Sequence, residues 1–235
     1  MITVYTITFN EEILIQFMID HYQSRFPGCH IIIYDNSSTD ETVKIAKANG
    51  CEVKYYNSNN TLNDALHMKI KNTCWQDAKT DWVLISDLDE LLDINEQSLK
   101  NEEITGATIF KAEGWTMVNM EDNIDIKNIK HGYRSNDEIS YDKCLLFNKK
   151  YIQQINYCMG AHKCNPVGRV QYGNIYKLYH YRFINPDLEV AKCKLTAQRL
   201  SEENKKCGCG TRCLMTEEQI RADFYGRRIN ISKIF

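Results

Sequence analysis

The sequence lacks several features that mark particular classes of protein. No apolar run approaches the ~20 residues of a membrane-spanning helix, so we expect no transmembrane segment. The N-terminal residues carry neither a basic stretch nor a small-residue cleavage site, so we expect no signal peptide and a soluble, cytoplasmic protein. The net charge of −2 shows no basic excess, and we therefore expect no nucleic-acid partner.

Glycine-rich nucleotide-binding motifs are missing as well. No Gly-x-Gly-x-x-Gly follows the first predicted strand, which argues against a dinucleotide-binding oxidoreductase. That strand leads instead into the acidic, glycine-free segment Thr8-Phe9-Asn10-Glu11-Glu12. A nucleotidyltransferase usually has a basic, glycine-rich loop at this place. The acidic segment therefore counts against this class of enzyme, which stays an alternative.

Cysteine is frequent, with 10 residues, yet few of them are grouped. Without a secretory signal, we predict free thiols in a reducing compartment. Cys207, Cys209 and Cys213 form a cluster that could bind zinc with a fourth ligand, and Cys193, Cys164 or His162 are candidates for it. No Cys-x-x-Cys pair accompanies the cluster, which favours a reduced loop over a zinc site.

The order of apolar and polar segments predicts an α/β fold. In the first hundred residues, strands are predicted at Ile2–Thr8, Cys29–Asp35, Glu52–Tyr56 and Trp82–Ile85, and helices at Glu11–Arg25, Val43–Ala48 and Thr61–Trp75. In the second half, strands are predicted at Ala107–Lys111, Lys143–Phe147 and Ile175–Phe183, and helices at Leu188–Asn204 and Glu217–Gly226. Alternating strands and helices favour a mostly parallel sheet within a single domain.

Polar residues follow three of the predicted strands where each strand ends. They are the segments Phe9-Asn10-Glu11, Asp35-Asn36 and Asp87-Leu88-Asp89-Glu90. Ligands of parallel sheets bind beyond the carboxyl ends of the strands, so these segments should converge on one crevice. Asp87 and Asp89 would repel each other without a cation, which suggests a site for a divalent metal and a diphosphate. The alternative is a solvated turn whose acids cap the next helix.

Four motifs in this order resemble GT-A-fold glycosyltransferases of family 2. They are Thr8-Phe9-Asn10-Glu11, the segment Tyr34–Thr42, Lys71-Asn72 followed by Ala78-x-x-Asp81, and Asp87-Leu88-Asp89-Glu90. The later segments Lys143–Phe147, Gly160–His162 and His180-Tyr181 resemble a branch similar to family 92. Three residues depart from the family pattern: Asn36 replaces a frequent acid, Ser37 replaces the usual glycine, and Lys71 replaces arginine.

The resemblance implies a GT-A fold in a single domain, 1–235. Residues 1–100 would form a Rossmann-like nucleotide-sugar-binding half and residues 101–235 an acceptor-binding half. The implied activity is metal-dependent transfer of one hexose, with Mn²⁺ or Mg²⁺, from a nucleotide-diphosphate donor, most simply a UDP-sugar. The acceptor would be a hydroxyl of a glycan, protein or lipid, and the anomeric centre would invert. The Gln-x-x-Arg-Trp motif of processive synthases is missing, which favours transfer of a single sugar.

The resemblance also implies roles for individual residues. The metal ligands would be Asp87, Asp89 and His180, although His180 could equally be a histidine of a half-buried strand. The donor site would be lined by Thr8, Phe9, Asn10, Glu11, Asp35, Lys71, Asp87 and Leu88. Among these, Asp35 would accept the uracil N3–H.

The acceptor side is predicted from isolated residues. The catalytic base would be Glu113 or Asp142, and Trp115 and His162 would line the acceptor site. For the two acids the alternative is a solvated surface charge, and for Trp115 it is a core position. A non-catalytic nucleotide-sugar-binding or assembly module is the alternative for the whole chain.

Overall fold

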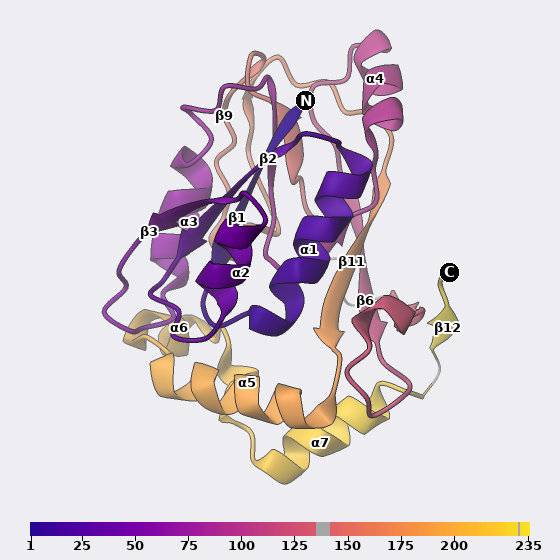
Figure 1. The fold of residues 1–235 in the computed structure, drawn as a ribbon. Helices are drawn as coiled ribbons and strands as arrows, with labels where there is room; N and C mark the ends of the chain where they lie inside the picture. The colour runs from indigo at the N-terminus through magenta and orange to yellow at the C-terminus, as the bar shows by residue number, and fades with distance from the viewer. Residues whose placement is uncertain (135–141, 230) are drawn as a thin grey trace.

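Four parallel strands from the first half of the chain and one antiparallel strand from the second half form a five-stranded sheet (Figure 1). The computed structural model describes residues 1–134, 142–229 and 231–235. The strand order is β3-β2-β1-β4-β8, and only β8 is antiparallel to its neighbour. The strands are β1 (Ile2–Thr8), β2 (His30–Asp35), β3 (Glu52–Tyr55), β4 (Trp82–Ile85) and β8 (Leu146–Asn148). The connecting helices are α1 (Glu12–Arg25), α2 (Thr42–Ala48) and α3 (Asp64–Thr73).

Both faces of this sheet are covered because its strands are apolar on both sides. Successive side chains of a strand point to opposite faces. Val4 and Ile33 accordingly pack in one hydrophobic cluster with residues of α1, whereas Tyr5 and Ile32 pack in another with Met68 of α3. The predicted α/β fold class with a mostly parallel sheet is confirmed. The carboxyl ends of β1, β2 and β4 therefore lie at one edge of the molecule.

The second half adds another five-stranded sheet, in the order β12-β7-β6-β11-β5. In it, β6 and β11 run parallel and the other pairs are antiparallel. Its strands are β5 (Glu90–Leu92), β6 (Ala112–Val118), β7 (His131–Tyr133), β11 (Tyr176–Phe183) and β12 (Ser232–Lys233), and β9 (Ile152–Gln154) pairs separately with β10 (Val167–Gly168). The helices of this half are α4 (Glu96–Ile104), α5 (Pro186–Arg199), α6 (Glu202–Cys207), α7 (Glu217–Gly226) and the short 3₁₀ segments η1 (Ile126–Asn128), η3 (Met159–Ala161) and η4 (Thr211–Leu214). One large hydrophobic cluster contains residues of both halves, from Ile2 to Ile184.

Two element predictions for the second half were wrong. The segment Ala107–Lys111 is no strand, because Ile109 forms only isolated bridges and the strand begins at Ala112. The predicted helix Leu188–Asn204 is two helices, because the backbone turns at Leu200. Ser201 then caps α6 by accepting a hydrogen bond from the Asn204 N–H.

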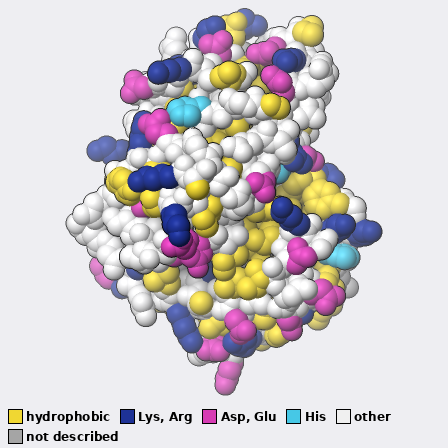
Figure 2. All heavy atoms as spheres, viewed as in Figure 1, with side chains coloured by type: hydrophobic (Ala, Val, Ile, Leu, Met, Phe, Trp, Pro, Cys, Tyr) yellow, Lys and Arg dark blue, Asp and Glu magenta, His cyan; other side chains and the backbone are white. Residues whose placement is uncertain are grey.

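The C-terminal helices lie across the edge where the strands of the first sheet end. Figure 1 shows α5 passing beneath this edge, close to the start of α1, with α7 on its outer side. Asn185 caps α5 and Thr216 forms a capping box at α7. Figure 2 shows positive and negative side chains interspersed over this face of the molecule. Within the described part of the chain, no helix is long and apolar enough to cross a membrane.

Candidate functional site

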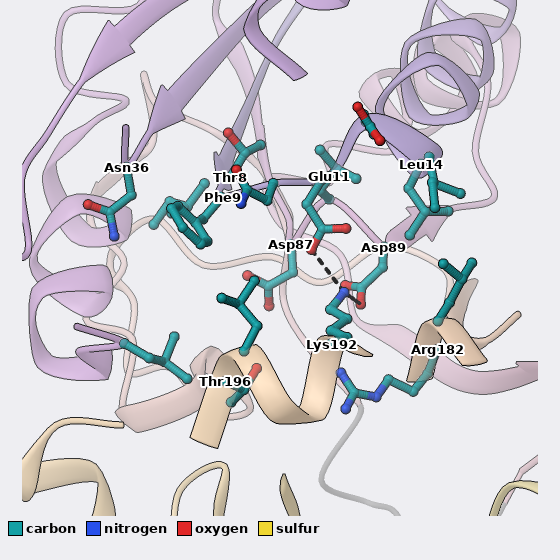
Figure 3. Close-up of a pocket in the computed structure, with 18 of the residues that line it drawn as sticks. Thr8, Phe9, Glu11, Leu14, Asn36, Asp87, Asp89, Arg182, Lys192 and Thr196 are labelled. Atoms are coloured by element: carbon teal, nitrogen blue, oxygen red, sulfur yellow. Dashed lines mark ion pairs between the residues drawn. The ribbon is translucent and has the colours of Figure 1, made fainter. Parts of the chain in front are cut away.

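A cavity of about 480 Å³ opens between the carboxyl ends of the parallel strands and α5. One side is the strand-end wall, defined here as residues 7–14, 36–40 and 87–89; the other is the α5 wall, residues 181–199. Figure 3 shows side chains from both walls pointing into the space between them. The convergence that the sequence predicted is thus present for Thr8, Phe9, Asn10, Glu11, Asn36, Asp87, Leu88 and Asp89.

The strand-end wall is held together by hydrogen bonds between the loops that follow β1 and β2. The Asn10 N–H donates to Ser38 Oγ at 2.9 Å, and the Thr39 N–H donates to Asn10 Oδ1 at 2.8 Å. Asn10 and Ser37 both adopt a positive φ, at 54° and 60°. Such a backbone is costly for residues with a side chain and is often found at functional sites. It also explains why glycine is usual at the position of Ser37.

Asp35 lies beneath this wall and does not line the cavity. Its side chain is fully buried, and its carboxylate accepts hydrogen bonds from Thr8 Oγ1 and from the backbone N–H and hydroxyl of Ser38. Both carboxylate oxygens are thereby engaged by the protein. Asp35 shapes the wall by holding the loop after β2, and its proposed contact with uracil stays a prediction.

Asp87 is neutralised by two lysines. Lys71 Nζ lies 2.6 Å from Asp87 Oδ1, and Lys143 Nζ lies 3.0 Å from Asp87 Oδ2. Burial alone would raise the pKa of Asp87, but the two ammonium groups hold it well below its usual range. Lys143 also contacts both oxygens of the buried Glu90, at 2.7 and 2.8 Å. Lys71, predicted to contact the donor, is buried and instead fixes Asp87.

Asp89, on the strand-end wall, forms an ion pair with Lys192 on the α5 wall. Its Oδ2 lies 3.5 Å from His180 Nε2 and 3.5 Å from Lys192 Nζ, and the same ammonium group lies 2.9 Å from Glu11 Oε1 (Figure 3). Burial raises the pKa of Glu11, an effect that Lys192 opposes. Burial acts in the same direction on Asp89, but Lys192 and His180 hold its pKa well below the usual range.

The predicted metal ligands are only partly brought together. Within the described ranges, no three His, Cys, Asp or Glu side chains form a group that could hold a metal ion. Asp87 does not fit a cation, because a lysine faces each of its oxygens. Asp89 and His180 do fit, because Mg²⁺ and Mn²⁺ accept one or two protein ligands when substrate phosphates supply the others. The metal requirement stays a prediction that rests on this pair.

The predicted zinc cluster is divided into two thiol pairs. Cys207 Sγ lies 2.6 Å from Cys209 Sγ, whereas Cys213 Sγ lies 3.0 Å from Cys193 Sγ. Among the described residues, no three of these side chains form a group that could hold a metal ion. All ten cysteines are free thiols.

The predicted acceptor residues lie away from the cavity. Glu113 lies near the start of β6, opposite Lys177 of the parallel strand β11, whereas the cavity begins at Tyr181. Four residues of strand separate these positions by roughly 13 Å. Arg134 pairs with both Glu113 and Asp142, at 3.0 and 2.9 Å. Their catalytic role stays a prediction, with no support from this geometry.

Trp115 and His162 are also not among the residues that line the cavity. The Trp115 indole N–H donates to Glu113 at 3.1 Å, and Lys177 lies over its ring. Burial, reinforced by the nearby Lys143, lowers the pKa of His162 to about 4. His162 is therefore neutral at pH 7 and lies near Lys143, behind Asp87.

The α5 wall was the part that the sequence interpretation missed. The sequence analysis assigns no role to Lys192 or Arg199. The wall residues 188, 192, 195 and 199 have the spacing of one helix face.

Comparison with known proteins supports the resemblance in the first half. Residues 3–97 match the model of glycosyl transferase family 2. The structure of S. aureus TarS aligns with 97% of this chain at 16% identity and a TM-score of 0.49, and the chain spans 43% of that protein. A TarS fragment, 1–349, in complex with UDP-GlcNAc aligns over 97% of this chain and 72% of its own, at 16% identity and a TM-score of 0.44.

Glucosyl-3-phosphoglycerate synthase from Mycobacterium tuberculosis, in complex with Mg²⁺ and UDP, aligns over 48% of this chain and 43% of its own. The identity is 21% and the TM-score 0.34. No curated protein sequence matches the chain. Because all three TM-scores are below 0.5, we base the function on the family match and on the cavity.

Proposed function

We propose that the protein transfers a single sugar from a nucleotide-diphosphate donor, a UDP-sugar, to an acceptor hydroxyl, because residues 3–97 match the model of glycosyl transferase family 2. The observation that carries the proposal is the cavity where the family's own segments converge. Phe9, Asn10, Asp87 and Asp89 line it together, although β1 and β4 are about 80 residues apart in the sequence. The acceptor is a glycan, protein or lipid, and the family resemblance implies inversion.

The strand-end wall offers surfaces for both parts of such a donor. Phe9 and Asn10 follow β1 and would shape the base pocket, together with Tyr56, which follows β3. Asp87 and Leu88 would lie beside the ribose and diphosphate. Asp35, through the loop it holds, keeps the base pocket in shape.

The diphosphate end of the donor would lie next to Asp89. Asp89 and His180 would hold Mg²⁺ or Mn²⁺, which, when bound, neutralises charge on the leaving diphosphate. Asp87 would not bind the metal, because Lys71 and Lys143 pair with its carboxylate. Its role would be to hold the turn after β4 in place. The cavity lies partly below the surface, which lowers the local dielectric constant and strengthens these interactions.

Release of UDP from UDP-sugars tests the proposal. Purified protein is incubated with UDP-glucose, UDP-galactose or UDP-GlcNAc and Mn²⁺, and free UDP is measured over time. A glycosyltransferase shows slow donor hydrolysis that rises when an acceptor is added. A non-catalytic binding module binds the donor without releasing UDP, and that outcome would reject the enzymatic function.

A further inference from the structure

Acidic residues outnumber basic residues in the lining of the cavity, and by themselves they would repel a diphosphate. Its acidic lining residues are Glu11, Glu12, Asp40, Asp64, Asp87, Asp89 and Glu189. Lysine and arginine line it, among the described residues, at Arg182, Lys192 and Arg199. All three belong to the α5 wall. Apart from the charge of a bound metal ion, the positive charge that faces the donor would therefore come from this wall.

Among these three, Lys192 is the cation best placed for phosphate. Arg182 is engaged with Glu189 at 3.0 Å, and Glu189 also pairs with Arg212. Lys192 projects across the cavity to Glu11 and Asp89 on the opposite wall, and its side chain is 34% exposed (Figure 3). A flexible ammonium group with water access can exchange these carboxylates for the more highly charged oxygens of a diphosphate.

Arg199 lies at the other end of the same helix face. Its guanidinium group lies 3.2 Å from the centre of the Phe9 ring, and its Nε–H donates to Asn60 O at 3.3 Å. The side chain is buried, at 8% exposed. A planar guanidinium stacked on an aromatic ring forms a flat, polarisable floor, a surface that also suits a nucleobase.

The spacing of Lys192 and Arg199 links the two ends of the cavity. Seven residues are two helical turns, or about 10.5 Å along α5. One end faces Phe9, which follows β1, and the other faces Asp89, which follows β4. These are the ends assigned above to the base and to the diphosphate.

We propose that α5 is a nucleotide-recognition helix, in which Lys192 binds the donor's diphosphate and Arg199, on Phe9, supports its pyrimidine base. This inference rests on the proposed function. Neither residue belongs to the segment that matches the family model, so the recognition is built by the second half of the chain. When the donor binds, Lys192 leaves Glu11 and Asp89, and the Asp89 carboxylate can then bind the metal ion.

Separate titrations with UDP and uridine distinguish the two contacts. Both ligands are titrated in the presence of Mn²⁺ into the wild-type protein, Lys192→Met, Arg199→Lys and the control Lys194→Met. Lys194 lies on the same helix but is 60% exposed and pairs with Glu217. Lys192→Met should weaken UDP at least about tenfold and leave uridine unchanged, as expected for a lost charge-assisted contact. Lys192→Arg should recover part of the loss.

Arg199→Lys should weaken UDP and uridine by the same factor, because lysine keeps the charge but not the planar stacking surface. Lys194→Met should change neither, and the melting temperature of each variant without ligand monitors folding. Wild-type affinity for UDP in Lys192→Met, or for uridine in Arg199→Lys, would overturn the inference while leaving the proposed function intact. If the wild-type protein binds neither ligand, the proposed function falls and the inference falls with it.

Discussion

The two walls of the cavity differ in charge and in the part of the chain that forms them. The strand-end wall presents Glu11, Asp87 and Asp89 from the loops that follow parallel strands. The α5 wall presents Lys192 and Arg199 from a single helix in the second half. Neither wall alone suits a nucleotide diphosphate, because the first repels it and the second offers no pocket for its base. The proposed donor site therefore requires both halves of the chain.

The walls also differ in what supports them. The strand-end wall stands on a central sheet whose residues belong to the two largest hydrophobic clusters. The α5 wall reaches the largest cluster through Tyr181, Ile184 and Leu188. Further along α5, it is backed by a small cluster, Val190, Cys193, Cys213 and Ile220, and by side-chain caps at its helices. Regions with few buried apolar contacts open at lower free energy. We therefore expect the α5 wall to be the part that adjusts when a ligand binds.

The largest effect should follow from breaking the buried ion pair between Lys143 and Glu90. Lys143 and Glu90 are 2% and 3% exposed, and Glu90 belongs to β5 of the second sheet. Glu90→Gln should lower the free energy of unfolding by about 3–5 kcal/mol, because it leaves a buried ammonium group partly uncompensated. Urea denaturation measures the change.

Glu96→Gln is the matched control, because Glu96 pairs with Lys100 at the surface. Its effect should stay within about 1 kcal/mol. If Glu90→Gln were as mild as this control, the stability of the fold would not depend on the pair.

The next largest effect should be on catalysis through Asp89. Asp89→Asn keeps the shape of the side chain but removes the charge that faces His180 and Lys192. Release of UDP from a UDP-sugar should fall about 100-fold or more, in the range seen when one electrostatic group is removed from an active site. Asp81→Asn serves as control, because Asp81 is exposed and pairs with Lys150. Equal rates for both variants would show that Asp89 has no part in the reaction.

The strand-end wall could be predicted from the sequence because its residues are consecutive in short motifs. An apolar strand that ends in Thr8-Phe9-Asn10-Glu11 or in Asp87-Leu88-Asp89 places its polar residues at the sheet edge by backbone geometry alone. The role of Asp35 was harder, since the motif does not reveal that Ser38 engages both carboxylate oxygens. Lys71 and Lys143 are 72 residues apart, and only the fold brings both to Asp87.

The α5 wall could not be predicted in the same way. Lys192 and Arg199 stand in a helix of ordinary composition, and nothing local distinguishes them from Lys194. Their function depends on how α5 packs across the sheet edge, a tertiary contact that helix periodicity does not specify. The distance of Glu113 from the cavity could not be predicted either, because the strand was expected at Ala107–Lys111 whereas β6 begins at Ala112.

A smaller effect should appear in the pH dependence of the free energy of unfolding, through His21 of α1. Burial lowers the pKa of His21 in α1 to about 4, and its Nε2 lies 3.0 Å from Leu92 O. The unfolded chain binds this proton near pH 6.5, so the native state should lose stability as the pH falls from about 6.5 through 4. Discounted for partial exposure, the loss should be about 1–2 kcal/mol.

Denaturant unfolding at a series of pH values measures this loss. His21→Gln cannot gain a proton, so this variant should show a flatter pH profile than the wild-type protein between pH 6.5 and 4. Identical profiles would mean that His21 is not held neutral by burial. UDP affinity at pH 7 should be unaffected, because His21 does not line the cavity.

The smallest effect should come from the cap of α7, which lies against α5. Thr216 accepts a hydrogen bond from the Gln219 N–H, and the Gln219 side chain accepts one from the Thr216 N–H. Thr216→Ala should cost about 1 kcal/mol. Hydrogen exchange should become faster in α7 and α5 and stay unchanged in α1. Equal acceleration in all three helices would contradict the view that the α5 wall opens independently of the sheet.

The central claim, a uridine diphosphate site between the two walls, is tested most directly by ligand-induced stabilisation. UDP, GDP, CDP and TDP are each added with and without Mn²⁺, and the melting temperature is measured. A ligand at a hundred times its Kd adds about 2.7 kcal/mol, or roughly 5–10 °C for a chain of this size. We predict the largest rise with UDP and Mn²⁺. The absence of a rise with every nucleotide would contradict the account.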